Sequence, residues 1–123
     1  MRLIMSEPTS TGTATTIDLG SIERELRQQD AYLREGHTAR TLVRESDLRL
    51  VLVAMRTGSH IAEHHTDKTA SVHALSGHVR LRLPDRIVDL TSGQIFVIEP
   101  GLRHAVDAVA DSAFLLTLGW KAA

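Results

Sequence analysis

The sequence predicts an all-β fold, an antiparallel sandwich or barrel, preceded by one short helix. Short apolar segments that alternate with polar residues recur from residue 41 to residue 118. Glycine, proline and polar turn residues separate them at intervals of about 8–12 residues, which is typical of sandwiches and barrels. No helical pattern lies between consecutive strands, and parallel strands would need such crossover helices. A parallel α/β sheet is therefore disfavoured.

The first 16 of the 123 residues are expected to form a flexible tail. Five of the eight residues from 9 to 16 are threonine, so this stretch has little apolar surface to bury. It also lacks the apolar run of a secretory signal. Residues 17–123 are expected to form one domain, because the length matches a single core and no linker interrupts it.

Residues 21–35 are predicted to form the only helix. Asp18 or Ser21 can cap its first turn, and Gly36 is a plausible stop. Its apolar positions, spaced four and seven residues apart, are Ile22, Leu26 and Leu33. This stripe is thin, so the helix needs a sheet to lie on.

Nine strands are predicted after Gly36. The clearest is 78–83, where Val79, Leu81 and Leu83 alternate with basic residues, as in a strand with one buried face. The predicted strands cover residues 41–44, 48–55, 60–65, 69–76, 78–83, 87–90, 95–98, 104–109 and 113–118.

Composition excludes several classes of function. A net charge of -1 and a pI near 6.6 do not suit a general nucleic-acid binder. The absence of cysteine excludes disulfides, thiolate zinc sites and iron–sulfur clusters, and fits a cytoplasmic protein. No apolar run is long enough to span a membrane. Phosphate loops and nucleophile elbows are also missing.

Histidine is the residue type that points to chemistry. Five of the seven histidines fall between residues 60 and 78, so this stretch is the first place to look for a site. The seven are His37, His60, His64, His65, His73, His78 and His104.

Two stretches, 58–77 and 93–104, resemble the two characteristic motifs of the cupin family, small RmlC-like jelly-roll barrels. The first stretch, GSHIAEHHTDKTASVHALSG, matches at its two end glycines and at one of two adjacent histidines. The second, GQIFVIEPGLRH, matches at Gly93, Gly101 and His104, with Glu99 in the place of the family proline. The resemblance covers roughly residues 41–119 and implies a cupin-type double-stranded β-helix.

The resemblance also implies a metal site of three histidines and one glutamate inside the barrel. The family glutamate falls on Ala70, which has no ligand atom. The His-x-His pair falls on His64 and Thr66 with one spacer length, or on Glu63 and His65 with the other. His104 stands at the ligand position of the second motif. The candidate metal ligands are therefore His64, His65, His104 and Glu63.

The other histidines have weaker claims. His73 lies three residues after Ala70, so in a regular strand it points to the opposite face from the position of the family glutamate. His60 shares the phase of His64 if the strand is continuous. His78 alternates with basic residues and is expected on a solvated face, and His37 is expected in a loop near the end of the helix.

Two functions follow from this resemblance. One is a metal-dependent protein that binds or converts a small molecule, with oxygenase- or isomerase-type chemistry at a Zn, Ni, Fe, Mn or Cu ion. The other is a metal-free cupin that serves as a non-catalytic ligand-binding or sensor module, because jelly rolls host both classes.

A homodimer is also predicted. Three segments, 50–55, 95–98 and 113–118, are apolar on both faces, whereas a barrel strand needs only one. The thin helix cannot cover them all, so a second subunit is the simplest cover. Resemblance to small cupins implies the same back-to-back arrangement.

Overall fold

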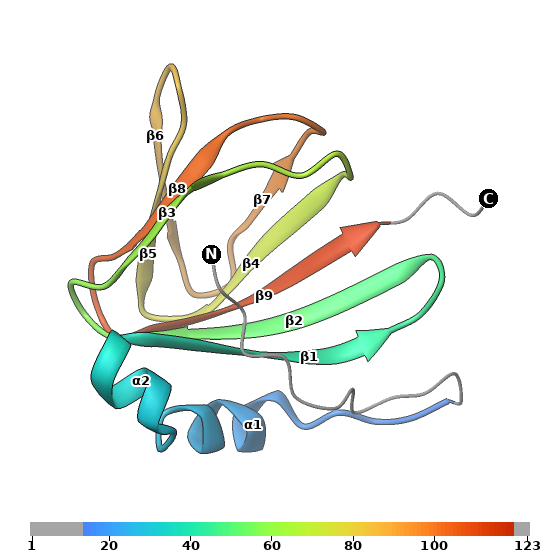
Figure 1. Cartoon of the computed structure of the whole chain (residues 1–123), viewed down its shortest axis with the longest axis vertical. Coiled ribbons are helices and arrows are strands. Elements are labelled where there is room, and N and C mark those ends of the chain that lie inside the picture. The colour runs from blue at the N-terminus through green and yellow to red at the C-terminus, as the bar shows by residue number, and fades with distance from the viewer. Residues whose placement is uncertain (1–13, 120–123) are drawn as a thin grey trace.

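The computed structural model describes residues 14–119 as two antiparallel sheets that pack face to face, with two short helices against one of them (Figure 1). The five-stranded sheet has the order β1-β2-β9-β4-β7 and the four-stranded sheet the order β3-β8-β5-β6. The strands are β1 (His37–Arg44), β2 (Leu48–Met55), β3 (His60–His64), β4 (Ala70–Ser76), β5 (His78–Arg82), β6 (Ile87–Thr91), β7 (Ile95–Ile98), β8 (His104–Ala108) and β9 (Ser112–Gly119).

The predicted jelly-roll architecture is confirmed. Each predicted strand exists, and most boundaries agree within one residue. The first strand is the exception, since it begins at His37 rather than at residue 41. His37 therefore opens β1 opposite Met55, and the expectation that it lies in a loop is wrong. Most of the predicted tail, residues 1–13, lies outside the described residues.

The predicted single helix is instead two helices, α1 (Leu19–Leu26) and α2 (Asp30–Glu35). Asp18 caps α1 by accepting a hydrogen bond from the Ser21 amide, and Gly36 ends α2 with a left-handed φ of 87°. The break between the helices shifts the phase of the apolar face by one residue. Tyr32 is therefore buried, whereas Leu33, expected on the buried face, is 53% exposed.

The main core lies between the two sheets. Along the regular parts of the strands every second residue points into it, as the alternation of side chains requires, and bulges interrupt this pattern in β1, β3 and β4. On the five-stranded sheet the buried inward residues include Val51, Val53 and Met55 of β2 and Phe114 of β9. The four-stranded sheet contributes Ile61, Val79, Leu81, Leu90, Val106 and Ala108. We call the surface of each sheet that contacts this core its inner face.

A second, smaller core lies between the helices and the outer face of β1 and β2. Ile22, Leu26 and Tyr32 of the helices pack there. The sheet supplies Leu42, Val43, Leu52 and Ala54. The two helices thus cover Leu52 and Ala54, two outer residues of the 50–55 segment.

The outer face of the far edge strand, β7, has no such cover from the described residues. Ile95 is 57% exposed and Val97 is 62% exposed. Both alternate with inward residues that contact the main core, Phe96 and Ile98. Of the three segments predicted to be apolar on both faces, 95–98 is therefore the one with large apolar side chains that are exposed.

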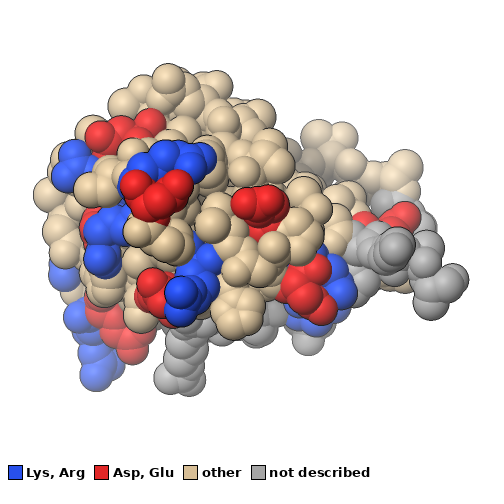
Figure 2. Space-filling view, turned by 90° about the horizontal axis from the view of Figure 1, so that it is seen from above, with Lys and Arg blue, Asp and Glu red and all other residues tan. Residues whose placement is uncertain are grey.

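The outer face of the four-stranded sheet is polar, and its charges are paired across strands. Arg80 of β5 binds Asp89 of β6, with 2.8 Å between Nε and Oδ1. In Figure 2 the acidic and basic side chains are interspersed over the surface in view rather than gathered in one patch. This mixture of charges agrees with the prediction that the basic residues of β5 lie on a solvated face.

Gly77, the last residue of the first motif, connects β4 to β5 with a left-handed φ of 77°. A Cβ atom at this position would collide with the carbonyl oxygen of Asp111 and with the Ser112 hydroxyl. Glycine is therefore required here for two reasons, the backbone conformation and the close approach of the β8–β9 turn. Neither helix described within residues 14–119 is long and apolar enough to cross a membrane.

Candidate functional site at the His104 end of the barrel

A β-bulge brings two histidines together on the inner face of the four-stranded sheet. Ile61 of β3 lies opposite Val106 of β8, but the next paired residue is His64, opposite His104. Three residues of β3 thus span two residues of β8, which returns His64 to the inward side. The resulting site lies where β3 ends and β4 begins, and we call this end of the barrel the His104 end.

The two imidazole rings contact each other edge to face. Their centroids are 4.3 Å apart and their planes meet at 62°. Nδ1 of His64 lies 2.9 Å from the Ala62 carbonyl oxygen, and Nδ1 of His104 lies 2.9 Å from that of Leu102. A carbonyl oxygen can only accept, so each Nδ1 donates and each neutral ring keeps its lone pair on Nε2. The backbone therefore sets both the orientation and the tautomer of each ring.

The two rings are buried to different extents, and burial favours the neutral form of His64. His104 is only 5% exposed, and His64 is half-buried. Burial is the largest cause that lowers the pKa of His64 below its ordinary value, and the neighbouring His104 lowers it further. The hydrogen bond to the Ala62 carbonyl opposes this shift without cancelling it.

The other candidate ligands do not join the pair. His65 and Glu63 are both exposed, and Glu63 lies in the bulge between Ile61 and His64. Ala70 occupies the family glutamate position on the inner face, where it is 3% exposed. Within residues 14–119, no group of three or more His, Asp or Glu side chains is placed to hold a metal ion. The described residues thus bring together His64 and His104, two positions at which the resemblance implies ligands, without a third histidine or a carboxylate beside them.

His60 faces outward, because the bulge interrupts the strand between it and His64. Its Nδ1 lies 2.7 Å from Oδ1 of Asp107, and Arg82 binds the other oxygen of the same carboxylate at 2.8 Å. The condition that would have aligned His60 with His64, a continuous strand, is therefore not met.

His73 and His78 also lie on outer faces. His73 alternates away from the buried residues Val72 and Ala74, as the phase argument predicts. His78 lies 3.2 Å from Asp89 on the outer face of the four-stranded sheet. Neither contributes to the site inside the barrel.

Sequence reasoning missed two arginines at this end of the barrel. Leu48 and Leu50 contact the outer core, so Arg49 between them lies on the inner face of β2. Its direct partner across the strands, Leu118, contacts the main core, which gives the same assignment. Arg44 of β1 lies directly opposite Arg49. The available signal was the phase that Arg49 shares with Val51 and Val53.

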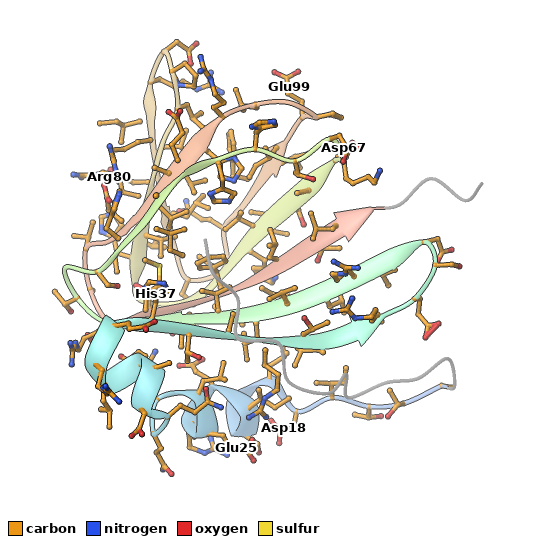
Figure 3. The ribbon with its side chains drawn as sticks, in the orientation of Figure 1. Asp18, Glu25, His37, Asp67, Arg80 and Glu99 are labelled. Carbon is orange, nitrogen blue, oxygen red and sulfur yellow. The ribbon has the colours of Figure 1, made fainter. Side chains whose placement is uncertain are left out.

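The loops at this end carry carboxylates that lie outside the barrel. Asp67 is in the β3–β4 loop and Glu99 follows β7, and both are exposed. In Figure 3 Glu99 points away from the strands and Asp67 lies at the tip of its loop. Asp67 is 3.4 Å from the Lys68 ammonium nitrogen. These acids therefore belong to the rim rather than to the interior.

A shallow groove of about 390 Å³ lies elsewhere, on the outer face of the five-stranded sheet. Its lining is almost wholly apolar and includes Leu42, Leu50 and Leu115. These residues belong to the opposite face of the sheet from Arg49 and Leu118. The groove is thus separate from the histidine pair.

Comparison with known proteins agrees with this architecture. The family model described as the AraC-like ligand binding domain matches residues 50–119. No match was found among curated proteins. A conserved Streptococcus pyogenes protein of unknown function is 26% identical, with a TM-score of 0.74, and the match covers 98% of this chain and 99% of that one.

More distant solved structures share the fold. A cupin superfamily protein from Desulfitobacterium hafniense is 14% identical over 69% of this chain and 78% of its own, with a TM-score of 0.66. Oxalate decarboxylase from Bacillus subtilis is 21% identical over 70% of this chain and 26% of its own, with a TM-score of 0.65. The family model spans more than half of the sequence, and the sheets have the jelly-roll arrangement of these structures. The chain therefore belongs to the cupin family, as a member of its AraC-like ligand-binding domains.

Proposed function

We propose that this cupin binds a small polar molecule at the His104 end of its barrel, as a non-catalytic ligand-binding or sensor module. The observation that carries the proposal is the pair of Nε2 lone pairs on His64 and His104. Both rings are held by backbone carbonyls, so a ligand meets two acceptors whose orientation is fixed before it binds. An apolar wall with a few fixed polar groups is the usual composition of a small-molecule site.

Histidine ring signals in NMR spectra test this proposal directly. A panel of small polar molecules, containing neutral sugars, sugar acids and hydroxy acids, would be added to the full-length protein. We expect at least one of them to shift the ring signals of His64 and His104, and His104→Gln to abolish binding. His60→Gln is the matched control, because His60 lies on the outer face of β3, the strand that carries His64. Shifts confined to outer-face residues would overturn the proposal.

A divalent transition metal, Zn, Ni, Fe, Mn or Cu, is the second candidate for the occupant. The specific observation in its favour is the hydrogen bond from each Nδ1 to a carbonyl, which is how proteins commonly orient metal-binding imidazoles. Two observations oppose this candidate. Ala70 stands at the position of the family glutamate and supplies no carboxylate, and His65 and Glu63 are exposed. Oxygenase- or isomerase-type chemistry belongs to this candidate.

Elemental analysis of untagged protein distinguishes the two candidates. One equivalent of a transition metal that His104→Ala abolishes would favour the metal site. We expect instead that the native chain retains little metal and that Ala70→Glu gains affinity for Zn²⁺ or Ni²⁺, because it supplies an inward carboxylate beside the two imidazoles. Ala74→Glu, on the same face of β4 but further from the histidines, is the matched control.

We also propose that a second copy of the chain covers the outer face of β7. The support is the exposure of Ile95 and Val97 beside a sheet whose other edge is covered by helices. Large exposed apolar side chains in neighbouring positions commonly mark interfaces. Light scattering at micromolar concentration should give the mass of two chains, and Val97→Lys should reduce it to one. A native mass of one chain would exclude the dimer.

A further inference from the structure

We propose that the second copy of the chain attaches edge to edge, with its β7 paired antiparallel to β7 of the first copy. This inference rests on the proposed dimer and deepens it, because it names the contact that joins the two copies. Adding a strand to a free sheet edge is a common mode of recognition. The five-stranded sheets of the two copies then form one continuous sheet across a twofold axis.

The first support is that β7 is the edge strand with the least protection against pairing with another chain. The edges are β1 and β7 in the five-stranded sheet, and β3 and β6 in the four-stranded sheet. Proteins commonly protect such edges with bulges, charged residues or proline. A bulge interrupts β1 and another interrupts β3, and β6 has Asp89 at its centre. By contrast, β7 reads Ile-Phe-Val-Ile and has no charge, no proline and no break in its register with β4.

The second support is the direction of the backbone groups of β7. Antiparallel partners alternate between pairs that exchange hydrogen bonds and pairs that do not. The Ala74 amide of β4 donates to the Gln94 carbonyl over 2.9 Å, and Phe96, two residues further on, bonds to β4 in the same phase. Ile95 and Val97 alternate with these residues, so their N–H and C=O groups point away from β4. Within residues 14–119 no other strand pairs with this edge.

The third support is that the side chains of β7 fit a second copy of the same strand. Ile95 and Val97 are exposed on the outer face, at 57% and 62%. On the inner face Phe96 is half-buried, and the guanidinium carbon of Arg86 lies 6.0 Å from its ring centroid. With Phe96 opposite its own copy, Ile95 of each chain lies opposite Val97 of the other. Side chains directly opposite each other are about 5 Å apart, so the exposed apolar residues shield one another from water.

The symmetry of the pairing favours a second copy over an unrelated strand. An antiparallel pair of identical strands is symmetric about its centre, so one twofold axis satisfies the backbone groups of Ile95 and Val97 in both copies. Glu99, the first charged residue after β7, then lies opposite Gly93 of the other copy, and no like charges meet. The edge is therefore complementary to itself in hydrogen bonds, in apolar surface and in charge.

Amide hydrogen exchange tests edge pairing on the native full-length chain. Exchange rates would be measured by NMR above and below the dissociation constant of the dimer, which sedimentation gives. We expect the Ile95 and Val97 amides to exchange at least about 10-fold more slowly in the dimer. The Asp89 amide is the matched control, because it faces the free edge of β6. Thr91, in the same phase, donates to the Gln94 side chain rather than to β5. The exchange rate of Asp89 should not depend on concentration.

Proline and threonine variants of β7 separate the backbone contact from the side-chain contact. Val97→Pro removes an N–H that points to the free edge, a position at which sheets tolerate proline. Twofold symmetry counts the lost hydrogen bond twice, so we expect a dissociation constant at least about 30-fold higher. Val97→Thr keeps the N–H and the branched side chain, and it should raise the constant less than about 5-fold. Ile95→Pro provides a second variant in case Val97→Pro does not fold.

The outcomes distinguish edge pairing from the proposed dimer. A dimer whose Ile95 and Val97 amides exchange as fast as in the monomer would mean that the second copy covers β7 by another contact, and edge pairing would be wrong. The mass of a single chain at every concentration would overturn both proposals. Protection of these two amides at every concentration in a monomer would mean that the same chain covers the edge, which also overturns the inference. So would a folded Val97→Pro protein that dimerises as tightly as Val97→Thr.

Discussion

Strands β3 and β8 carry two histidine sites only four residues apart, and their surroundings differ completely. Inside the barrel, His64 contacts His104, and both rings donate to backbone carbonyls. Outside it, His60 contacts the Asp107 carboxylate in a half-exposed cluster with Arg82. The same residue type on the same strand is therefore a neutral acceptor on one face and a partner in a charged network on the other.

The difference shows that one extra residue in a strand can decide chemical role. Without the bulge, His60 and His64 would share a face, because both have the same parity along β3. With it, Ile61 and His64 both point inward, and His60 points to the solvent. Burial then lowers the pKa of the inward ring, His64.

Removing one ring of the inner His64–His104 pair should have the largest effect on the free energy of unfolding. His104→Ala removes a buried ring and leaves the Leu102 carbonyl without its donor. We expect a loss of about 2–4 kcal/mol in the free energy of unfolding, the usual range when a buried side chain is truncated and a polar group loses its partner. Urea unfolding followed by circular dichroism measures it.

His104→Gln is the control for this variant, since its amide can still donate a hydrogen bond and occupies more of the volume. We expect it to recover part of the lost stability. Equal stability of the native and His104→Ala proteins would show that the inner pair does not pack as described.

The dependence of stability on pH tests the same comparison between the inner and outer histidines. We expect its effect on stability to be smaller than that of His104→Ala. The pKa of His64 is lowered in the folded state, so the unfolded chain binds more protons between that value and the ordinary 6.5. The contribution of His64 is therefore fully present above pH 6.5 and decreases as the pH falls through its folded-state pKa. Unfolding midpoints measured from pH 8 to pH 5 should fall, and His64→Gln should make the decrease shallower.

The carboxylates on the outer face affect stability in a separate, lower pH range. The pKa of Asp89 is lowered, first by its hydrogen bond to Arg80 and then by that to His78. Its contribution is present above its ordinary pKa of 3.8 and is lost only at lower pH. An acid-induced decrease between pH 6.5 and 5 that persists unchanged in His64→Gln would contradict the assignment to the inner site.

Disrupting the outer cluster of His60, Arg82 and Asp107 should have the smallest effect on the free energy of unfolding. Asp107→Asn removes the charge that binds both His60 and Arg82 on an exposed face. Exposed ion pairs contribute about 1 kcal/mol or less, and salt weakens them further. Urea unfolding in low and high salt should show a small difference that disappears at high salt. A loss as large as that of His104→Ala would mean that the outer cluster has a structural role equal to the inner pair.

Much of the fold could be predicted from the sequence because its signals are local. Alternating apolar residues and glycine-containing turns located all nine strands, and Gly36 marked the end of the helical region. The helix break was not predicted, because Leu33 and Tyr32 are both apolar enough to be buried. Only packing against β1 and β2 selects Tyr32.

The site was predicted in part. His104 and His64 were both named as inward candidates, but the sequence left two registers open around His64 and His65. The bulge chose between them, and a bulge depends on the pairing of β3 with a strand 40 residues further along the chain. Arg44 and Arg49 were missed because their place in a common inward row requires the register of several strands at once.

The sequence by itself determined the residue types available to this barrel and the period that makes them strands. It excluded cysteine chemistry and placed alanine at position 70, where the family resemblance expects a carboxylate. The tertiary structure decided which histidines meet and which charges face inward. The reason is physical: alternation fixes relative sides within one strand, whereas bulges and cross-strand register set which side is the interior.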